Sequence, residues 1–168
     1  MAAFHYQDPI SKLITTIKTN PHAPELLQLS GLLATTIADR YETNELPQII
    51  IPLPLHWRKL THRGFNQSYS IARSLCQKLP GTELRNDIYY RHTYSPPQHL
   101  QGKHQRLRFM RNAFAVDKRI DGQSVAIVDD VVTTKATAIA AASSVIKAGA
   151  KSVDIWCIAR TGWHIAAL

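Results

Sequence analysis

Cysteine is scarce in this sequence, with only Cys76 and Cys157 among 168 residues. Two isolated cysteines provide neither a disulfide framework nor a metal cluster, and both lie in apolar stretches, so we interpret them as small buried hydrophobic residues. Glycine is also scarce, with seven residues, while 45% of the residues are hydrophobic. These values exclude fibrous and disordered classes. Every apolar run is shorter than the roughly 20 residues that cross a bilayer, and no signal peptide opens the chain. We therefore expect one compact cytoplasmic domain.

Acidic residues are nearly absent from one segment of the chain. Between residues 56 and 111 there are 11 Lys and Arg against 2 acids, a net charge of +9. The remainder holds 9 Lys and Arg against 10 acids, a net charge of −1. A basic face that is merely solvated remains an alternative, but such concentration favours a polyanionic partner. The candidate DNA contacts in its second half are Lys103, Arg106, Arg108 and Arg111.

Apolar periodicity predicts an α/β domain. We expect a helix after Asp8-Pro9, with Asp8 as its N-cap, and further helices over about 24–41, 66–78 and 136–148. Strands are predicted at 48–53, 84–90, 124–128 and 152–159, with a loop over 93–105 and a basic helix and turn over 106–114. Strands and helices alternate from residue 48 onward, which predicts a parallel sheet covered on both faces. The predicted parts are a helical segment 1–47, an α/β core 48–161 and a tail 162–168.

The segment Val125–Thr137 (VAIVDDVVTTKAT) carries the clearest chemical pattern. A buried strand leads into two carboxylates, Asp129 and Asp130, and then into a threonine loop and a helix. Ligands of open parallel sheets bind at the carboxyl ends of strands, where the next helix start offers free N–H groups to an anion. Carboxylates beside a phosphate cradle suit a ligand that presents hydroxyls next to its phosphate. The alternative, an acid pair of the receiver or phosphatase kind, would need a separate nucleophilic Asp and different loops.

This segment resembles the signature loop of the type I phosphoribosyltransferases, which reads apolar strand, Asp-Asp, two apolar residues, Thr-Thr-Gly and a further Thr. The resemblance implies a type I phosphoribosyltransferase-like fold, a mostly parallel sheet flanked by helices with an N-terminal helical segment. It also implies that Asp129 and Asp130 hold the ribose hydroxyls of phosphoribosyl diphosphate, with Mg²⁺ arriving on the ligand and no metal held by the protein alone. The implied phosphate loop consists of Val131, Val132, Thr133, Thr134, Lys135, Ala136 and Thr137.

Lys135 departs from that family pattern, which has Gly at this position. Glycine there is expected to relieve a crowded backbone near the phosphate. A lysine either adds a favourable charge or blocks the cradle, so the resemblance leaves transferase activity open.

A narrower resemblance covers nearly the whole chain. The residues that carry it resemble the competence protein ComF family, also called ComFC, and its strongest part is HWRKLTHRGFNQ. The family implies handling of incoming single-stranded DNA in natural transformation or nutritional DNA use, with the DNA-translocation machinery at the inner face of the membrane as a further partner. Its usual N-terminal four-cysteine zinc ribbon is absent here, either because the chain was truncated to its transferase-like domain or because this member never had one. The histidines lack zinc-ligand spacing, so no zinc is expected in this chain. The matching segments are Phe4–Lys18, Ile51–Gln67, Arg106–Phe114 and Ala148–Thr161.

The predicted loop over 52–65 is where these functions diverge. Arg58, Lys59 and Arg63 would grip a pyrophosphate group in a transferase, or would follow a DNA backbone. Alternatively, Arg63 and Asn66 merely cap and orient the next helix. Aromatic side chains are candidate stacking faces for bases, although most aromatics at such spacings are core residues: Trp57, Phe65, Tyr89, Tyr90, Tyr94 and Phe109.

Three functions follow from these patterns. We favour a DNA-handling protein that retains a phosphoribosyl-diphosphate-type loop. The alternatives are an active transferase with an unidentified acceptor and a regulatory domain that senses phosphoribosyl diphosphate. The fold alone does not choose among them, because function depends on the site.

Overall fold

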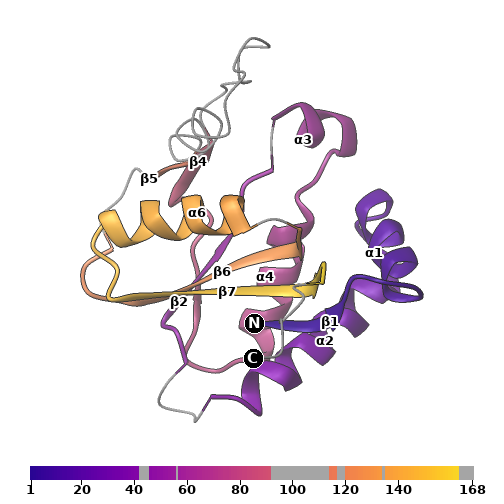
Figure 1. Cartoon of the computed structure of the whole chain (residues 1–168), viewed down its shortest axis with the longest axis horizontal. Coiled ribbons are helices and arrows are strands. Elements are labelled where there is room, and N and C mark those ends of the chain that lie inside the picture. The colour runs from indigo at the N-terminus through magenta and orange to yellow at the C-terminus, as the bar shows by residue number, and fades with distance from the viewer. Residues whose placement is uncertain (42–45, 56, 92–113, 117–119, 134, 163–168) are drawn as a thin grey trace.

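A five-stranded parallel sheet forms the centre of the protein in the computed structural model (Figure 1). The structure describes residues 1–41, 46–55, 57–91, 114–116, 120–133 and 135–162. In spatial order the strands are β1 (Ala2–His5), β7 (Ser152–Arg160), β6 (Ser124–Val132), β2 (Ile49–Pro52) and β3 (Glu83–Leu84). A separate antiparallel pair is formed by β4 (Tyr89–Arg91) and β5 (Phe114–Val116).

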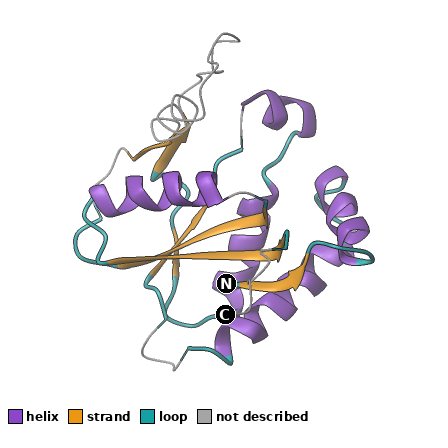
Figure 2. Ribbon diagram, in the orientation of Figure 1, coloured by secondary structure: helices purple, strands orange, loops and turns teal. Residues whose placement is uncertain are grey.

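Helices cover both faces of this sheet, as the buried run IIIP of β2 predicts (Figure 2). The helices are α1 (Ile10–Thr19), α2 (Pro24–Ala38), α3 (Trp57–Arg63), α4 (Gln67–Lys78) and α6 (Lys135–Lys147). Alternate residues of β2 enter two separate cores. Ile50 belongs to the core with α1, α2 and α4, whereas Ile49 and Ile51 belong to the core with α6 and the β4–β5 pair. None of the helices in the described part of the chain is long and apolar enough to cross a membrane. The predicted parallel α/β class is confirmed.

Apart from shifts in where individual strands and helices end, the predicted elements differ from the observed ones in four places. The N-terminal segment is not purely helical, because Ala2–His5 forms β1 at the sheet edge and pairs with β7. The helix that follows has Pro9, not Asp8, at its N-cap position, and Asp8 instead accepts a hydrogen bond from the Ser11 hydroxyl.

The remaining two differences concern the chain after β2. Residues 57–63 form the short helix α3 instead of a loop. The predicted strand 84–90 is two strands in two different sheets, since β3 ends at Leu84 and β4 starts at Tyr89. The predictions for 93–105 and for most of 106–114 lie outside the described residues, although Phe114 itself begins β5.

The packing of helix α4 depends on Leu75, whose side chain is fully buried between the sheet and α2. We expect Leu75→Ala to lower the free energy of unfolding by about 2–5 kcal/mol, because the cavity left behind closes only partly. Leu27→Ala on α2 is the control, since Leu27 is 61% exposed, and it should change stability by less than about 0.5 kcal/mol. Urea unfolding followed by circular dichroism measures both. Equal losses in the two variants would contradict this assignment of the core.

Candidate functional site

The acid pair lies inside β6, close to the carboxyl end of the strand. The sequence predicted that the strand ends at Val128, but β6 continues to Val132, with Asp129 opposite Cys157 of β7. On the other side β2 ends at Pro52, opposite Val128. The strand therefore carries both carboxylates just beyond the end of its neighbour β2, at the edge where ligands of parallel sheets bind.

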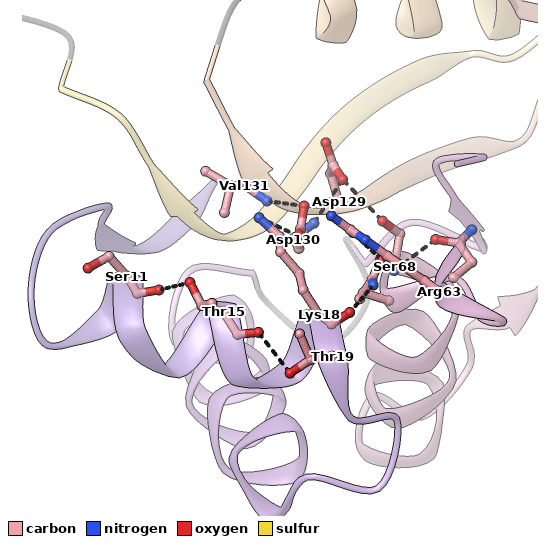
Figure 3. A network of polar contacts seen from close by, with 11 residues as sticks. Ser11, Thr15, Lys18, Thr19, Arg63, Ser68, Asp129, Asp130 and Val131 are labelled. Carbon is pink, nitrogen blue, oxygen red and sulfur yellow. Dashed lines mark hydrogen bonds and ion pairs between the residues drawn. The ribbon is translucent and has the colours of Figure 1, made fainter. Parts of the chain in front are cut away.

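Each carboxylate of the pair is held by a different helix (Figure 3). The Ser68 hydroxyl of α4 donates to Asp129 Oδ1 at 3.0 Å, and the backbone N–H of Asp130 donates to the same oxygen at 2.9 Å. The N–H of Val131 donates to Asp130 Oδ1 at 2.8 Å, and Lys18 Nζ of α1 lies 3.1 Å from Asp130 Oδ2. The two acids are thus oriented by two helices that are far apart in the sequence and by the backbone of β6 itself.

Burial dominates the electrostatics of Asp129. Removal from water raises the pKa of its carboxyl to about 7, and the neighbouring Asp130 charge acts in the same direction. Hydrogen bonds from the Asp130 backbone N–H and from Ser68 oppose that increase only in part. Asp129 therefore gains or loses its proton near neutral pH, as groups in functional sites often do.

A small hollow of about 60 Å³ opens beside Asp129 at the start of α6. Thr133 and Thr137 line it. The residue that follows β7 fixes this loop, since the Thr161 hydroxyl donates to the carbonyl of Thr133 at 3.0 Å. The first turn of α6, whose backbone N–H groups have no acceptor within the helix, lies at this hollow. The structure thus brings Asp129 and two of the predicted phosphate-loop threonines together, whereas Thr134 lies outside the described residues. The lining consists of Leu53, Ile127, Asp129, Val131, Val132, Thr133, Thr137, Ala138, Ala141 and Ile155.

Lys135 is the first residue of α6 and lines a different pocket from the one beside Asp129. No non-glycine residue in the described ranges has a positive φ, so the backbone at this position needs no glycine. Its side chain contributes to a larger, mainly apolar pocket of about 290 Å³ between α6 and the β1–β7 edge, which Arg160 and Cys157 also line. The lysine is therefore placed beside the acid-pair hollow and not within its lining.

The predicted cations of residues 52–65 lie on helix α3, which Figure 1 shows beyond the carboxyl ends of the strands. Arg58 and Lys59 are exposed, and the guanidinium of Arg58 lies 5.4 Å from the centre of the Trp57 ring. Arg63 is different, because its Nη1 donates to Oε1 of Gln67 at 3.1 Å. This contact supports α4, as the helix-orienting alternative predicted.

The remaining candidates are Asn66, the aromatic stacking residues and the basic residues proposed to contact DNA. Asn66 caps α4, accepting from the backbone N–H of Ser68, and also donates to the carbonyl of Leu53. Among the candidate stacking aromatics, Trp57 is 47% exposed, but Tyr89 is buried with its hydroxyl on the carbonyl of Ala141, so its assignment as a stacking face was wrong. The basic candidates Lys103, Arg106, Arg108 and Arg111 lie outside the described residues, as do Tyr94 and Phe109.

Sequence reasoning missed three residues of this site: Lys18, Gln67 and Ser68. Gln67 and Ser68 are nearly fully buried, at 1% and 2% exposure. Their sequence signal is weak, because polar residues after a helix N-cap are common at solvent-exposed positions as well. Lys18 looked like an ordinary basic residue in the last turn of a helix.

No family model matches this sequence. It is 32% identical over 158 residues to the DNA utilization protein YhgH of Escherichia coli, covering 93% of this chain and 69% of that protein. It is 33% identical over 162 residues to competence protein F of Haemophilus influenzae, with 93% and 70% covered. Among solved structures, a purine phosphoribosyltransferase from Pyrococcus horikoshii matches with a TM-score of 0.47 and 19% identity, over 81% of this chain and 82% of that one. The resemblance to ComF is confirmed, and the chain belongs to the ComF/YhgH family of competence and DNA utilization proteins.

Proposed function

We propose that this protein handles single-stranded DNA during DNA uptake or use, and that it binds a ligand of the phosphoribosyl diphosphate type at residues 129–137. The observation that carries the ligand proposal is the acid pair at the carboxyl edge of β6, directly before the amino end of α6. Carboxylates accept hydrogen bonds from ribose hydroxyls, while a helix start and threonine hydroxyls donate to phosphate. A ribose phosphate carries both groups on one small molecule.

Asp129 is the better placed of the two acids to receive a hydroxyl. The hydrogen bonds that described residues make to it fall on Oδ1, and its carboxylate lines the hollow beside Thr133 and Thr137. In this proposal Asp129 and Asp130 accept from the two ribose hydroxyls, and Ser68 keeps Asp129 in the orientation that this requires. The 5-phosphate then lies at the first turn of α6.

Magnesium fits this site as a companion of the ligand. The described residues include no group of three or more His, Cys, Asp or Glu that could hold a metal ion. Asp129 and Asp130 would be the carboxylates available at this edge of the sheet to a metal that enters with a diphosphate. Such an ion would neutralise the diphosphate charge.

The DNA-binding half of the proposal is supported by the concentration of positive charge and by sequence similarity to two relatives. The net charge of +9 between residues 56 and 111 is the electrostatic pattern of a phosphate-backbone partner. Two relatives are named for DNA utilization and for competence. Within the described residues, α3 presents Arg58 and Lys59 together with an exposed Trp57, a combination of cations and an aromatic face that suits single strands. We place this activity in the cytoplasm, with the translocation machinery at the inner membrane as a further partner.

An active phosphoribosyltransferase is the second candidate function. The raised pKa of Asp129 favours it, because a carboxyl that titrates near pH 7 is suited to accept a proton from an incoming nucleophile. No described residue identifies the acceptor substrate.

The acid pair should be essential for the ligand. We expect the double variant Asp129→Asn, Asp130→Asn to lose about 100-fold or more in affinity for phosphoribosyl diphosphate with Mg²⁺, since each charge-assisted hydrogen bond contributes roughly 1.5–3 kcal/mol. Isothermal titration calorimetry measures this affinity, and a thermal melt shows that the isosteric variant is folded. Unchanged affinity would refute the ribose-binding role.

Ligand binding should depend on pH through Asp129. Below a pKa of about 7 this carboxyl is protonated and accepts a ribose hydroxyl poorly, so the affinity for ribose 5-phosphate should rise with pH. Between pH 6 and pH 8 the ratio of the wild-type to the Asp129→Asn association constant should increase by up to about tenfold. Taking the ratio cancels the titration of the phosphate itself. A flat ratio would show that Asp129 does not contact the ligand.

Single-stranded DNA should bind with little sequence preference and with strong salt dependence. Release of counterions from roughly five phosphates gives a log–log slope near −3.5. The double variant Arg58→Ala, Lys59→Ala should reduce the magnitude of that slope by about 1.4, or about 0.7 for each phosphate that is no longer neutralised. Fluorescence anisotropy over a salt series measures it, with Lys147→Ala as control, because Lys147 is exposed in the last turn of α6. If the α3 variant and the α6 control change the salt slope equally, α3 does not bind the DNA backbone.

A further inference from the structure

Lys18 is held in place much more firmly than a surface lysine. It follows Ile17 on α1, and both Ile14 and Ile17 are completely buried in the core under the sheet. The Lys18 side chain is only 26% exposed and that of Asp130 only 15%. Its ammonium lies 3.1 Å from Asp130 Oδ2, as the close-up shows (Figure 3). Helix α1, which is anchored in the core, thus places the positive charge of Lys18 beside the acid pair.

The backbone of Lys18 is fixed by a second helix. Nε2 of Gln67 donates to the Lys18 carbonyl at 3.2 Å, which satisfies one of the carbonyls that a helix end leaves without an intrahelical partner. Gln67 is 1% exposed, and its Oε1 accepts from Arg63. Because α4 holds both the Lys18 backbone and, through Ser68, the Asp129 carboxylate, the lysine and the acid pair are positioned together.

This arrangement gives each oxygen of Asp130 one partner within the protein, and each oxygen keeps a second lone pair that can accept a ribose hydroxyl. Its Oδ1 accepts the N–H of Val131, and its Oδ2 is paired with Lys18. A divalent cation would need a carboxylate oxygen as a ligand, and it would meet the positive charge of the ammonium at the same place. The ion pair also leaves Asp129, Asp130 and Lys18 with a combined formal charge of −1 when all are ionised, instead of −2.

We infer that Lys18 is the built-in cation of the acid pair: it takes the place of a divalent metal at Asp130 and lets Asp129 and Asp130 bind a ribose phosphate without a metal ion on the protein. The inference rests on the proposed function for its ligand, but its first consequence concerns the metal alone. Magnesium then enters only on the diphosphate of a larger ligand. Lys18 acts as a positioning and charge-balancing residue, and it distinguishes this site from one that recruits its own metal.

The first test uses Mn²⁺ alone, followed by electron paramagnetic resonance of the full chain. The wild-type protein should show no binding at the acid pair, whereas Lys18→Met should bind Mn²⁺ at least about tenfold more tightly, because two carboxylates are then left without their cation. Adding Asp130→Asn to Lys18→Met should remove that gain. The matched control is Lys12→Met, since Lys12 lies on the same helix as Lys18 but is 78% exposed and pairs with Asp8, which precedes the helix. Equal Mn²⁺ affinity in the wild type and in Lys18→Met overturns the inference.

The second test uses ribose 5-phosphate, which carries no diphosphate. Wild-type affinity should be the same in EDTA and in Mg²⁺, while Lys18→Met should lose about tenfold in EDTA and regain most of it with Mg²⁺. A wild-type protein that binds this ligand only with Mg²⁺ contradicts the inference. If the wild type does not bind it in either buffer, the proposed ligand is wrong, and the Mn²⁺ measurement still decides the role of Lys18. Lys18→Gln, which keeps a polar stem, serves in both tests if the methionine variant melts early.

Discussion

Two adjacent carboxylates, Asp129 and Asp130, lie in a half-buried strand, and several elements of this structure supply the groups that compensate for their burial. Charges withdrawn from water are costly unless they are paired or hydrogen-bonded. Here Asp129 takes the Ser68 hydroxyl and a backbone N–H, and Asp130 takes Val131 and Lys18. The compensation for Asp129 is incomplete, since burial still raises its pKa to about 7. A strand end that served only stability would not need such a pair, which is why we interpret this edge of β6 as a binding site.

The start of α4 is the junction that links the parts of the site. Asn66 caps the helix and holds the carbonyl of Leu53, at the end of β2. Gln67 joins Arg63 on the basic helix α3 to the backbone of Lys18 on α1, and Ser68 reaches Asp129. Three consecutive residues therefore connect the proposed DNA-contacting helix with the proposed ligand site.

The sequence predicted those parts whose signals are local. The apolar run before Asp129 and the cap at Asn66 are visible in the residues themselves, and they correspond to β6 and to the start of α4. The kinship with ComF rested on motifs such as HWRKLTHRGFNQ. The extension of β6 through Asp129–Val132 was not predictable, because it depends on pairing with β7 and not on the polarity of these residues.

Long-range pairings account for most of what was missed. The short stretch Ala2–His5 has no strong strand pattern and becomes β1 because β7 offers an edge. Tyr89 was a candidate stacking face for bases, but the packing of Phe114 and α6 encloses it. Lys18 approaches Asp130 from a position 112 residues earlier in the chain, and no spacing rule relates two such residues. The chemistry of the acid pair was visible in the sequence, but its counterion was not.

The pairing of β1 with β7 has a consequence for how the protein folds. Within the sheet β1 has β7 as its neighbour, so the first strand finds its place only after the last one, Ser152–Arg160, is available. Contacts of such sequence separation close late and slow the folding of a chain. During synthesis the pairing of β1 with β7 therefore forms only once residues 152–160 have been made. Until then α1, which follows β1 and carries Lys18, is not connected to the sheet through that strand.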